Sequence, residues 1–536
     1  MLSRRLTPMH MLFLSINGII GSAWLFAPLY AAKIAGSAVI LSWLIGGIAT
    51  IIIAFTFAEL SSMLPIAGGT TRFAQLSQGT TTGFVISWVS WLSCVTMPPI
   101  EVQAVLQYLS TYVPSLIHIV NQVPILTYFG LICATLLMLV LSIINIASFR
   151  GFVGFNFIIF FFKILVIVLT IIMLIKTRFT FSNFAGIHFD TSIKQWEAIL
   201  SAVATGGIAF AFTGFKHGVE LAGETTNPKI SVPLSIVGSV VACLILYLGL
   251  QIAFIGSIDP KSLVNGWQQL DFSHEAGPFV GIAILLGLGW LVKLLLIDAA
   301  ISPLGAGLIY VTSTARIIYA MSVNHYLSPI LSRVNKNHFP VWAIFFNFVV
   351  GMFLFLPLPG WQNMVSFLVS AVVISYAMGP LALISLRKQL PEAKRPIRLP
   401  FIHFTCLVAF YFCNLISYWT GWSTMWKLAI AMLIGLVVYF IAIKKRQTDK
   451  KELGLQALIW LIPYLSGLVL ISYLGSYGGK NIITFGWDFL IIALFTLVIY
   501  CLALKFRLSE AATRQQFDHY KNERLLSNDL VAESLL

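Results

Sequence analysis

The chain has 536 residues, of which 59% are hydrophobic and only 10% are charged. Soluble globular domains carry about 25% charged residues, so this composition excludes a large soluble protein. The formal net charge of +14 does not indicate nucleic-acid binding, because the basic residues cluster between apolar runs, which is the pattern of the positive-inside rule. The six cysteines form no CxxC pair, so neither a metal site nor a disulfide framework is expected. The composition predicts an all-α polytopic membrane protein.

The first apolar run covers about residues 9–31 and is interrupted at its centre, where residues 16–26 read INGIIGSAWLF. A run of this length can cross a bilayer. However, Gly18 and Gly21 allow the backbone to leave helical geometry, and Ser22 adds a polar group at mid-membrane depth. Unwound backbone at that depth must face protein, water or a ligand. The preceding MLSRRLTP superficially resembles a signal peptide, but the run is too long, so we expect an uncleaved first span.

Further apolar runs follow to near the end of the chain, and each crossing needs about 20 residues. The expected spans, about fourteen by the same measure, are 9–31, 36–59, 82–112, 125–147, 153–175, 196–222, 231–257, 279–322, 340–357, 363–386, 401–421, 424–443, 455–475 and 484–505. Lys and Arg gather in loops on one side, notably at 387–398 and 444–451. This bias predicts a multi-pass protein of the cell (inner) membrane with both termini cytoplasmic.

The sixth expected span is also interrupted. Residues 210–228 read FAFTGFKHGVELAGETTNP, and spans one and six run in opposite directions across the membrane. Two broken spans at corresponding places in two halves point to the binding site of a secondary transporter. We therefore expect a five-plus-five inverted-repeat core in residues 1–390, with repeats at about 8–178 and 192–390. Residues 391–507 are then additional spans, and 508–536 a cytoplasmic polar tail.

Four motifs resemble one superfamily. NGIIGSAWLFAP is similar to the first-span G-x-I-G-S-G-I-F pattern of amino acid–polyamine–organocation permeases, and AELSSMLPIAGGTTRFAQLSQG to the end of their second span. FAFTGFKHGVELAGETTNPKISVP and STARIIYAMSVNHYLSP resemble their sixth-span and post-eighth-span signatures. TMPPIEVQAVLQY and LLIDAAISPLGAG are similar to stretches of bacterial aspartate–proton symporters. The sequence departs from the pattern at Ala23, where glycine is usual, at Lys216, where an acid is common, and at Asn324-His325, where Asp-Gly is common.

The resemblance implies a leucine-transporter-like fold and substrates with an α-amine and usually an α-carboxylate. Amide groups at the start of the outer half of span one can bind the carboxylate, and carbonyl groups at the break in span six can bind the ammonium. Glu101 lies deep in span three after Pro98-Pro99, which we expect to disturb that helix. The expected substrate-binding residues are Ile20, Gly21, Ser22, Ala23, Phe210, Ala211, Phe212, Thr213, Gly214, Glu101 and Lys216. The alternative is that the glycines only permit close helix packing.

Two deep ionisable groups are candidates for proton coupling. Lys163 lies in the middle of span five, in FNFIIFFFKILVIVL, where a charged lysine is costly and its neutral form is favoured. Superfamily members that couple to protons often have a lysine in this span. Asp298 in span eight is the second candidate. Lys293, five residues earlier in the same span, is a further deep ionisable group. The alternative for Lys163 is a permanently charged lysine held by carbonyl groups.

The sequence predicts a proton-coupled amino-acid importer that works by alternating access, with an acidic amino acid such as aspartate or glutamate as the preferred substrate. The expected partners are the amino acid, protons and the lipid bilayer, without a cofactor or metal. An amino acid or amine exchanger is the closest alternative, and a non-transporting membrane sensor a weaker one. Enzyme motifs such as HExxH and GxSxG are absent from the sequence, so we do not expect an enzyme.

Overall fold

The computed structural model of the chain describes residues 6–65, 69–120, 123–147, 152–187, 192–270, 272, 277–324, 326–335, 339–445 and 454–518. In these ranges, eleven helices are long and apolar enough to cross a membrane, or twelve when one bent pair counts as a span. The 41-residue stretch Ala23–Met63 is counted once although it contains two helices, and Val341–Leu354 is shorter than the others. An all-α polytopic membrane protein is confirmed, whereas the number fourteen stays a prediction.

The first part of the chain contains seven long helices, and the first of them begins at a helix-start signal. Pro8 occupies the first helical position, and the Thr7 side chain accepts a hydrogen bond from the His10 amide at 3.3 Å, which caps the helix. The helices are α1 (Pro8–Ile19), α2 (Ala23–Ala35), α3 (Val39–Met63), α4 (Gly69–Gln78), α5 (Thr80–Leu109), α6 (Tyr128–Ala147) and α7 (Phe152–Thr177).

The second part begins with the interrupted helix series α8 (Ile193–Thr205), α9 (Ile208–Ala211) and α10 (Lys216–Glu220). A π-helical turn joins α11 (Pro228–Pro233) to α12 (Ser239–Ser257). The remaining helices are α13 (Pro278–Leu285), α14 (Gly289–Val323), α15 (Val341–Leu354), α16 (Trp361–Tyr376), α17 (Met378–Gln389), α18 (Ile402–Trp419), α19 (Trp422–Lys445), α20 (Leu458–Leu474) and α21 (Trp487–Lys505).

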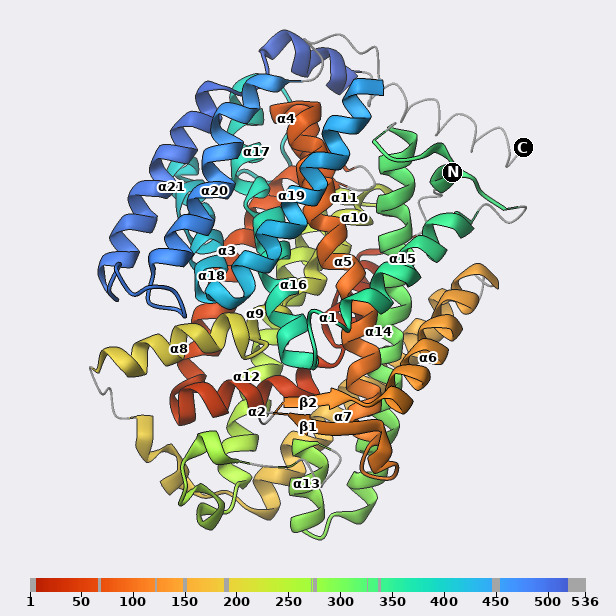
Figure 1. Cartoon of the computed structure of the whole chain (residues 1–536), viewed down its shortest axis with the longest axis vertical. Helices are drawn as coiled ribbons and strands as arrows, with labels where there is room; N and C mark the ends of the chain where they lie inside the picture. The colour runs from red at the N-terminus through yellow and green to blue at the C-terminus, as the bar shows by residue number, and fades with distance from the viewer. Residues whose placement is uncertain are drawn as a thin grey trace.

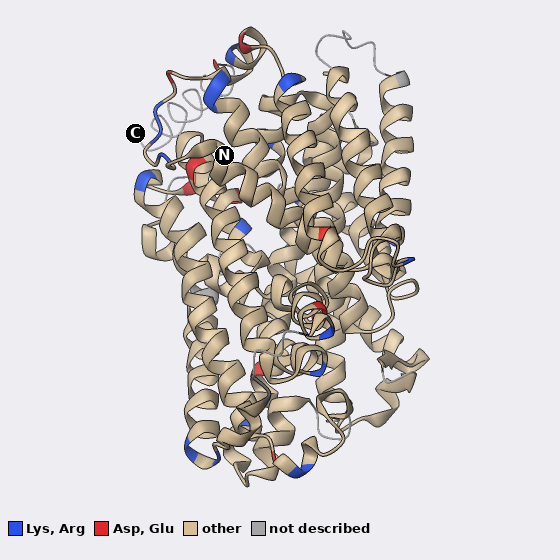
Figure 2. Cartoon of the chain, turned by 90° about the vertical axis from the view of Figure 1, so that its left-hand side faces the viewer, with Lys and Arg blue, Asp and Glu red and all other residues tan. Residues whose placement is uncertain are grey.

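Helix α5 lies at the centre of the molecule and packs against α14 and α16 (Figure 1). Its most apolar stretch is entirely buried, as is that of α16 and α17, so these helices face protein on all sides. The last helices, drawn in blue, lie along one side of the bundle, where α18 contacts α3, α16 and α17. Figure 2 shows that charged residues gather toward the two ends of the bundle and are sparse between them.

Three expectations about the elements need correction. Helix α5 runs unbroken through Pro98 and Pro99, so the expected disturbance is limited to the bonds that proline cannot make. The expected span 279–322 consists of two helices, α13 and α14, separated at Gly287, whose φ is +71°. The segment expected to link spans three and four forms an antiparallel hairpin, β1 (Ile117–Val120) and β2 (Val123–Leu126), with Ile117 opposite Leu126.

A buried carboxylate fixes the end of α3 against the end of α17. Glu59 is fully buried and accepts two hydrogen bonds from the Arg387 guanidinium, at 2.7 and 2.6 Å. It also accepts the Leu399 amide at 2.8 Å, and Arg395 lies 3.7 Å away. A bidentate pair of this kind is strong and geometrically specific. It holds the segment that follows α17, including Arg395 and Leu399, against the end of α3.

Candidate functional site

The first span is broken where the sequence predicts. Helix α1 ends at Ile19, and α2 begins at Ala23 with Ser22 at its N-cap. Ile20 leaves helical geometry, with φ −85° and ψ 88°. We expected the Gly21 amide to be available to a substrate carboxylate. In the structure it donates instead to the Ile19 carbonyl at 3.1 Å. A side chain at Gly21 would collide with the Glu101 carboxylate and the Ala306 methyl group. Glycine is therefore required here by space.

The sixth span has two interruptions, and only one was predicted. Residues Ile193–Ala211 and Thr213–Glu220 form a pair bent by 40°, which places the break within the predicted residues Phe210–Gly214. The second interruption, at Gly206-Gly207, lies one turn earlier and contains Gly207 with φ +92°. The adjacent Gly-Gly was the available signal, because a positive φ favours glycine.

The two breaks lie directly against each other. A Cβ atom on Gly214 would overlap backbone atoms of Gly18 and Ile19, and one on Gly18 would overlap the His217 ring. Small residues permit this close backbone approach, as they do between membrane helices generally. The structure therefore places Gly214, an expected site residue of span six, against the end of α1 just before the expected residues of span one.

Glu101 of α5 reaches the break in the first span. Its Oε2 accepts a hydrogen bond from the Ser22 amide at 2.8 Å, and its side chain is only 1% exposed. The carboxylate lies at the amino end of α2, where the helix dipole and unpaired amides favour negative charge. We expected this amide to bind a substrate carboxylate, and in the structure it binds a carboxylate of the chain itself.

Lys163 of α7 binds the same break from another side. Its fully buried Nζ donates to the Ile20 carbonyl at 2.8 Å, to the Ser302 carbonyl at 3.3 Å and to the Asn17 carbonyl at 3.5 Å. The carbonyl of Ile20 in the unwound backbone thus has the Lys163 amine as a hydrogen-bond partner. This geometry fits both a coupling lysine and a structural one, so the role of Lys163 stays a prediction.

Asp298 of α14 completes a buried charge cluster, by which we mean Glu101, Lys163 and Asp298. Both Asp298 oxygens accept from the Ser302 hydroxyl, at 2.9 and 2.8 Å, and the Ser302 carbonyl is a partner of Lys163. Two carboxylates and one amine are buried together, so full ionisation leaves one negative charge in excess. Uncompensated charge is costly in a low-dielectric interior, and one bound proton would neutralise it.

On the span-six side, the carbonyls at the break already have partners. The Tyr376 hydroxyl donates to the Thr213 carbonyl at 2.9 Å, and the Thr213 hydroxyl donates to the Phe210 carbonyl at 2.8 Å. A carbonyl oxygen has two lone pairs, so each can accept a further bond from an ammonium group. Ala211 and Phe212 are buried beside them. Tyr376 was missed because its hydroxyl lies in an otherwise apolar helix.

An aromatic cluster covers the start of α2. Trp361 of α16 donates from Nε1 to the Ser22 hydroxyl at 2.9 Å, and its ring stacks on Tyr30 with centroids 5.5 Å apart. Phe26 and Phe210 contact the same indole, at 5.4 and 5.7 Å. Phe210 is one of the expected substrate-binding residues, whereas Trp361 was not predicted. Buried tryptophans usually have a partner for the indole N–H, and for Trp361 this partner is Ser22.

Comparison with known proteins identifies the family. A family model described as amino acid permease matches residues 6–443. The chain belongs to the amino acid permease family. Over 511 residues it is 37% identical to the glutamate/serine transporter AimA of Bacillus subtilis (strain 168), covering 94% of each chain. Over 510 residues it is 33% identical to the aspartate-proton symporter of the same organism, covering 94% of this chain and 96% of the relative. The sequence-based recognition is confirmed.

In this permease, Lys216 begins α10, directly after the break at residues 212–215 in the sixth span, and its side chain contacts Glu220. Its Nζ is 3.8 Å from Glu220 Oε1, and His217 Nδ1 is 3.8 Å from Glu220 Oε2. Lys216 and His217 are both buried. The structure gives Lys216 an internal carboxylate, and its expected substrate contact stays a prediction.

Two residues considered near the site lie elsewhere in the permease. Trp290 is 47% exposed and Lys293 is also exposed, both in the first turns of α14. Neither side chain therefore points into the interior of the helix bundle. Helix α14 starts ten residues later than the expected span, which moves these positions to its end and surface.

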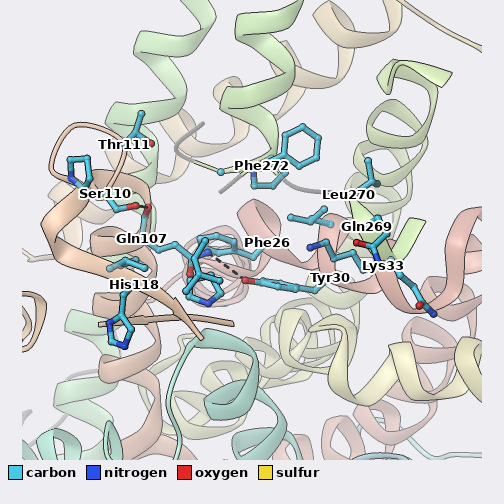
Figure 3. Close-up of a pocket in the computed structure, with 18 residues that line it drawn as sticks. Phe26, Tyr30, Lys33, Gln107, Ser110, Thr111, His118, Gln269, Leu270 and Phe272 are labelled. Carbon is cyan, nitrogen blue, oxygen red and sulfur yellow. Dashed lines mark hydrogen bonds between the residues drawn. The ribbon is translucent and has the colours of Figure 1, made fainter. Parts of the chain in front are cut away.

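A separate chamber is lined by Phe26 and Tyr30 of the aromatic cluster (Figure 3). This cavity has a volume of about 410 Å³ and is lined by α2, the end of α5, the β-hairpin and the loop before α13. Gln107 donates to the Tyr30 hydroxyl at 3.4 Å across it. In the loop before α13, the described residues Gln268–Leu270, Phe272 and Gly277 line this chamber. Residues 271 and 273–276 lie outside the described ranges.

Proposed function

We propose that this permease imports acidic amino acids, such as aspartate or glutamate, together with protons by alternating access. The transport core is the five-plus-five inverted repeat of residues 1–390, and residues 391–507 are additional spans. The contact between the two broken spans supports this proposal. It places the carbonyl groups at the break in span six and the amino end of α2 in one buried region. Broken helices that meet in this way hold substrate and coupling ions in secondary transporters.

The relatives support the substrate and the coupling ion. One is named for glutamate and serine, and the other for aspartate and protons. Each is aligned over nearly the full length of the chain. Serine is therefore the neutral amino acid to compare with the acidic ones in a transport assay.

The observation that carries the proposal is the 2.8 Å hydrogen bond from Lys163 to the Ile20 carbonyl. It joins an ionisable group directly to the unwound backbone of the first span. Protonation of Lys163 or of its neighbour Asp298 changes the charge next to that backbone, and a proton can therefore alter the stability of the break. Substrate binding and proton binding are then linked at one place.

The test is uptake of labelled aspartate, glutamate and serine into proteoliposomes with and without an inward proton gradient. Wild type, Lys163→Ala and Lys427→Ala are compared. Lys427 is the control, because its amine donates to the Pro357 carbonyl at 3.1 Å and lies 5.9 Å from the Trp426 ring centroid, away from both breaks. We expect gradient-driven accumulation in wild type and Lys427→Ala. In Lys163→Ala we expect this accumulation to be lost while exchange of internal for external substrate persists.

Other outcomes would separate the alternatives. Accumulation that is unchanged in Lys163→Ala would remove this lysine from coupling. Uptake that requires preloaded substrate and ignores the gradient would identify an exchanger. Binding without any transport would favour a membrane sensor.

For the topology, we propose a location in the cell (inner) membrane with both termini and the tail 508–536 on the cytoplasmic side. The predicted excess of Lys and Arg on that side supports it. Labelling of single cysteines placed at Lys261 and Lys388 with an impermeant reagent in intact cells tests this. We expect labelling at position 261 and none at position 388.

A further inference from the structure

The amide donor at the start of α2 is already bound by a carboxylate. Ser22 N–H lies 2.8 Å from Glu101 Oε2, and α2 continues from it for 13 residues. The other Glu101 oxygen lies where a side chain on Gly21 would be. Gly21 thus leaves room for one carboxylate group at this end of the helix, and Glu101 fills that room.

An amino acid substrate carries the same chemical group. Under the function proposed above, on which this inference rests, the α-carboxylate of the substrate needs the amide at the start of α2. One N–H group cannot serve two carboxylates, and two anions in contact in a buried site repel strongly. The substrate and Glu101 therefore exclude each other at this donor.

We propose that Glu101 is an internal competitor of the substrate: its carboxylate binds the Ser22 amide until a substrate carboxylate displaces it, and the displaced Glu101 takes up a proton. The proton comes from the outer solution and ends on the Glu101 carboxyl group. No bond of the substrate is broken. One proton is bound for each amino acid bound.

The surroundings of Glu101 explain why displacement requires a proton. The charged and titratable groups that interact with it are Lys163 from α7, Tyr310 from α14 and Tyr247 from α12. Asp298 from α14 interacts with Lys163 rather than with Glu101. Lys163 is held by backbone carbonyls and is also balanced by Asp298. An ionised Glu101 that loses the Ser22 amide would be a buried charge without that donor, which is strongly unfavourable. Protonation removes this cost.

The first experiment measures binding of L-aspartate, L-glutamate and L-serine to the purified full-length permease between about pH 5 and pH 9. Calorimetry in buffers of different ionisation enthalpy gives the protons taken up per substrate. For wild type we expect one proton per substrate and an affinity that falls by up to about tenfold per pH unit where Glu101 is ionised. Glu101→Gln should bind at least about tenfold more tightly at the upper end of this range, and proton uptake should disappear.

The control is Glu197→Gln on α8, which removes a partly buried carboxylate away from both breaks. It should behave as wild type. Weaker binding by Glu101→Gln than by wild type, or an unchanged proton uptake, would overturn the inference and show that Glu101 helps rather than competes.

The second experiment does not depend on the substrate. Glu101→Ala removes Cγ and the carboxylate and leaves their space, so acetate, which matches the missing group, should rescue the site. We expect acetate to raise the melting temperature of Glu101→Ala but not of wild type or Glu197→Ala. Absence of this difference would overturn the inference.

The two experiments separate this inference from the proposed function. Rescue by acetate without any amino acid transport by wild type would leave Glu101 as the ligand of this donor and remove the transport proposal. Transport by wild type without rescue, and without tighter binding by Glu101→Gln, would remove the inference alone.

Discussion

Gly214 packs directly on the backbone of Gly18, so that the breaks of the first and sixth spans are in contact. A Cβ atom at position 214 would overlap Gly18 and Ile19, and backbone cannot move aside as a flexible side chain can. We expect Gly214→Ala to reduce the free energy of unfolding by about 1–3 kcal/mol and to reduce uptake sharply, measured by thermal melting and proteoliposome transport.

The matched control for this change is Gly249→Ala in α12. A Cβ atom there meets the Ile171 methyl group at 3.5 Å, an ordinary contact. Alanine is the better helix former by up to about 1 kcal/mol, so stability should hold or rise. Full activity of Gly214→Ala would show that the contact between the breaks is not needed.

Tyr376→Phe removes the hydroxyl that donates to the Thr213 carbonyl at 2.9 Å. The loss of one buried hydrogen bond should cost about 1 kcal/mol, and the freed carbonyl should shift the KM for substrate. Tyr411→Phe is the control, because its hydroxyl donates to the Phe489 carbonyl at 3.0 Å, away from both breaks. It should affect stability to a similar degree and leave KM unchanged. Equal KM values for both variants would contradict a substrate role for the Thr213 carbonyl.

Glu59→Gln weakens the bidentate pair with Arg387 and leaves a buried guanidinium without its counter-charge. Removing one partner of a buried ion pair typically costs about 3–5 kcal/mol. We expect a large drop in melting temperature. Asp259→Asn provides the comparison, since the Arg178–Asp259 pair is 3.4 Å long but about one third exposed. Pairs at the surface contribute about 0–1 kcal/mol. A similar drop in melting temperature in both variants would show that the buried Glu59–Arg387 pair contributes no more than a surface pair.

Glu224 lies between α10 and α11, outside the membrane-spanning segments, and burial raises its pKa above the ordinary 4.5 while Arg316 opposes the shift. A raised pKa in the folded state means that this group's contribution to stability is fully present below about pH 4.5 and is lost as the pH rises through the raised pKa. We therefore expect Glu224→Gln to gain stability relative to wild type over that rise. Melting curves at several pH values check this.

Arg316→Gln gives an independent check of the sign. Without the guanidinium, the pKa of Glu224 should rise further. In Arg316→Gln, the contribution of Glu224 to stability should therefore be lost at a higher pH than in wild type. A difference between Glu224→Gln and wild type that does not change with pH would show that Glu224 is ionised equally in both states.

The sequence predicts the breaks well because their cause is local. Gly21 and Ser22 interrupt an apolar run, and Gly214 follows Thr213 in another, so residue type and membrane depth alone indicate unwound backbone. The depth of Lys163 is equally local. Its partners are not, since Ile20 and Ser302 come from helices far away in the chain, and no spacing rule specifies which carbonyl a long side chain reaches.

The remaining features depend on packing between distant segments. Glu101 was expected to meet a substrate, but only the assembled bundle shows that its carboxylate reaches the Ser22 amide. Trp361 and Tyr376 lie in an apolar helix whose polar atoms do not stand out in the sequence. The β-hairpin of Ile117–Leu126 was missed because a membrane-protein reading looks for long runs, and each of its strands has only four residues.

The backbone pairing of Leu6 with Glu224–Thr226 has a mechanical meaning. Leu6 N–H donates to the Glu224 carbonyl at 3.2 Å, and Thr226 N–H donates to the Leu6 carbonyl at 3.0 Å. Helix α1 is thus joined to the sixth-span region before its start, at Leu6, and again near its end, at Gly18–Gly214. Because these two segments lie some two hundred residues apart along the chain and are in contact at both ends of α1, we expect a displacement of one to move the other.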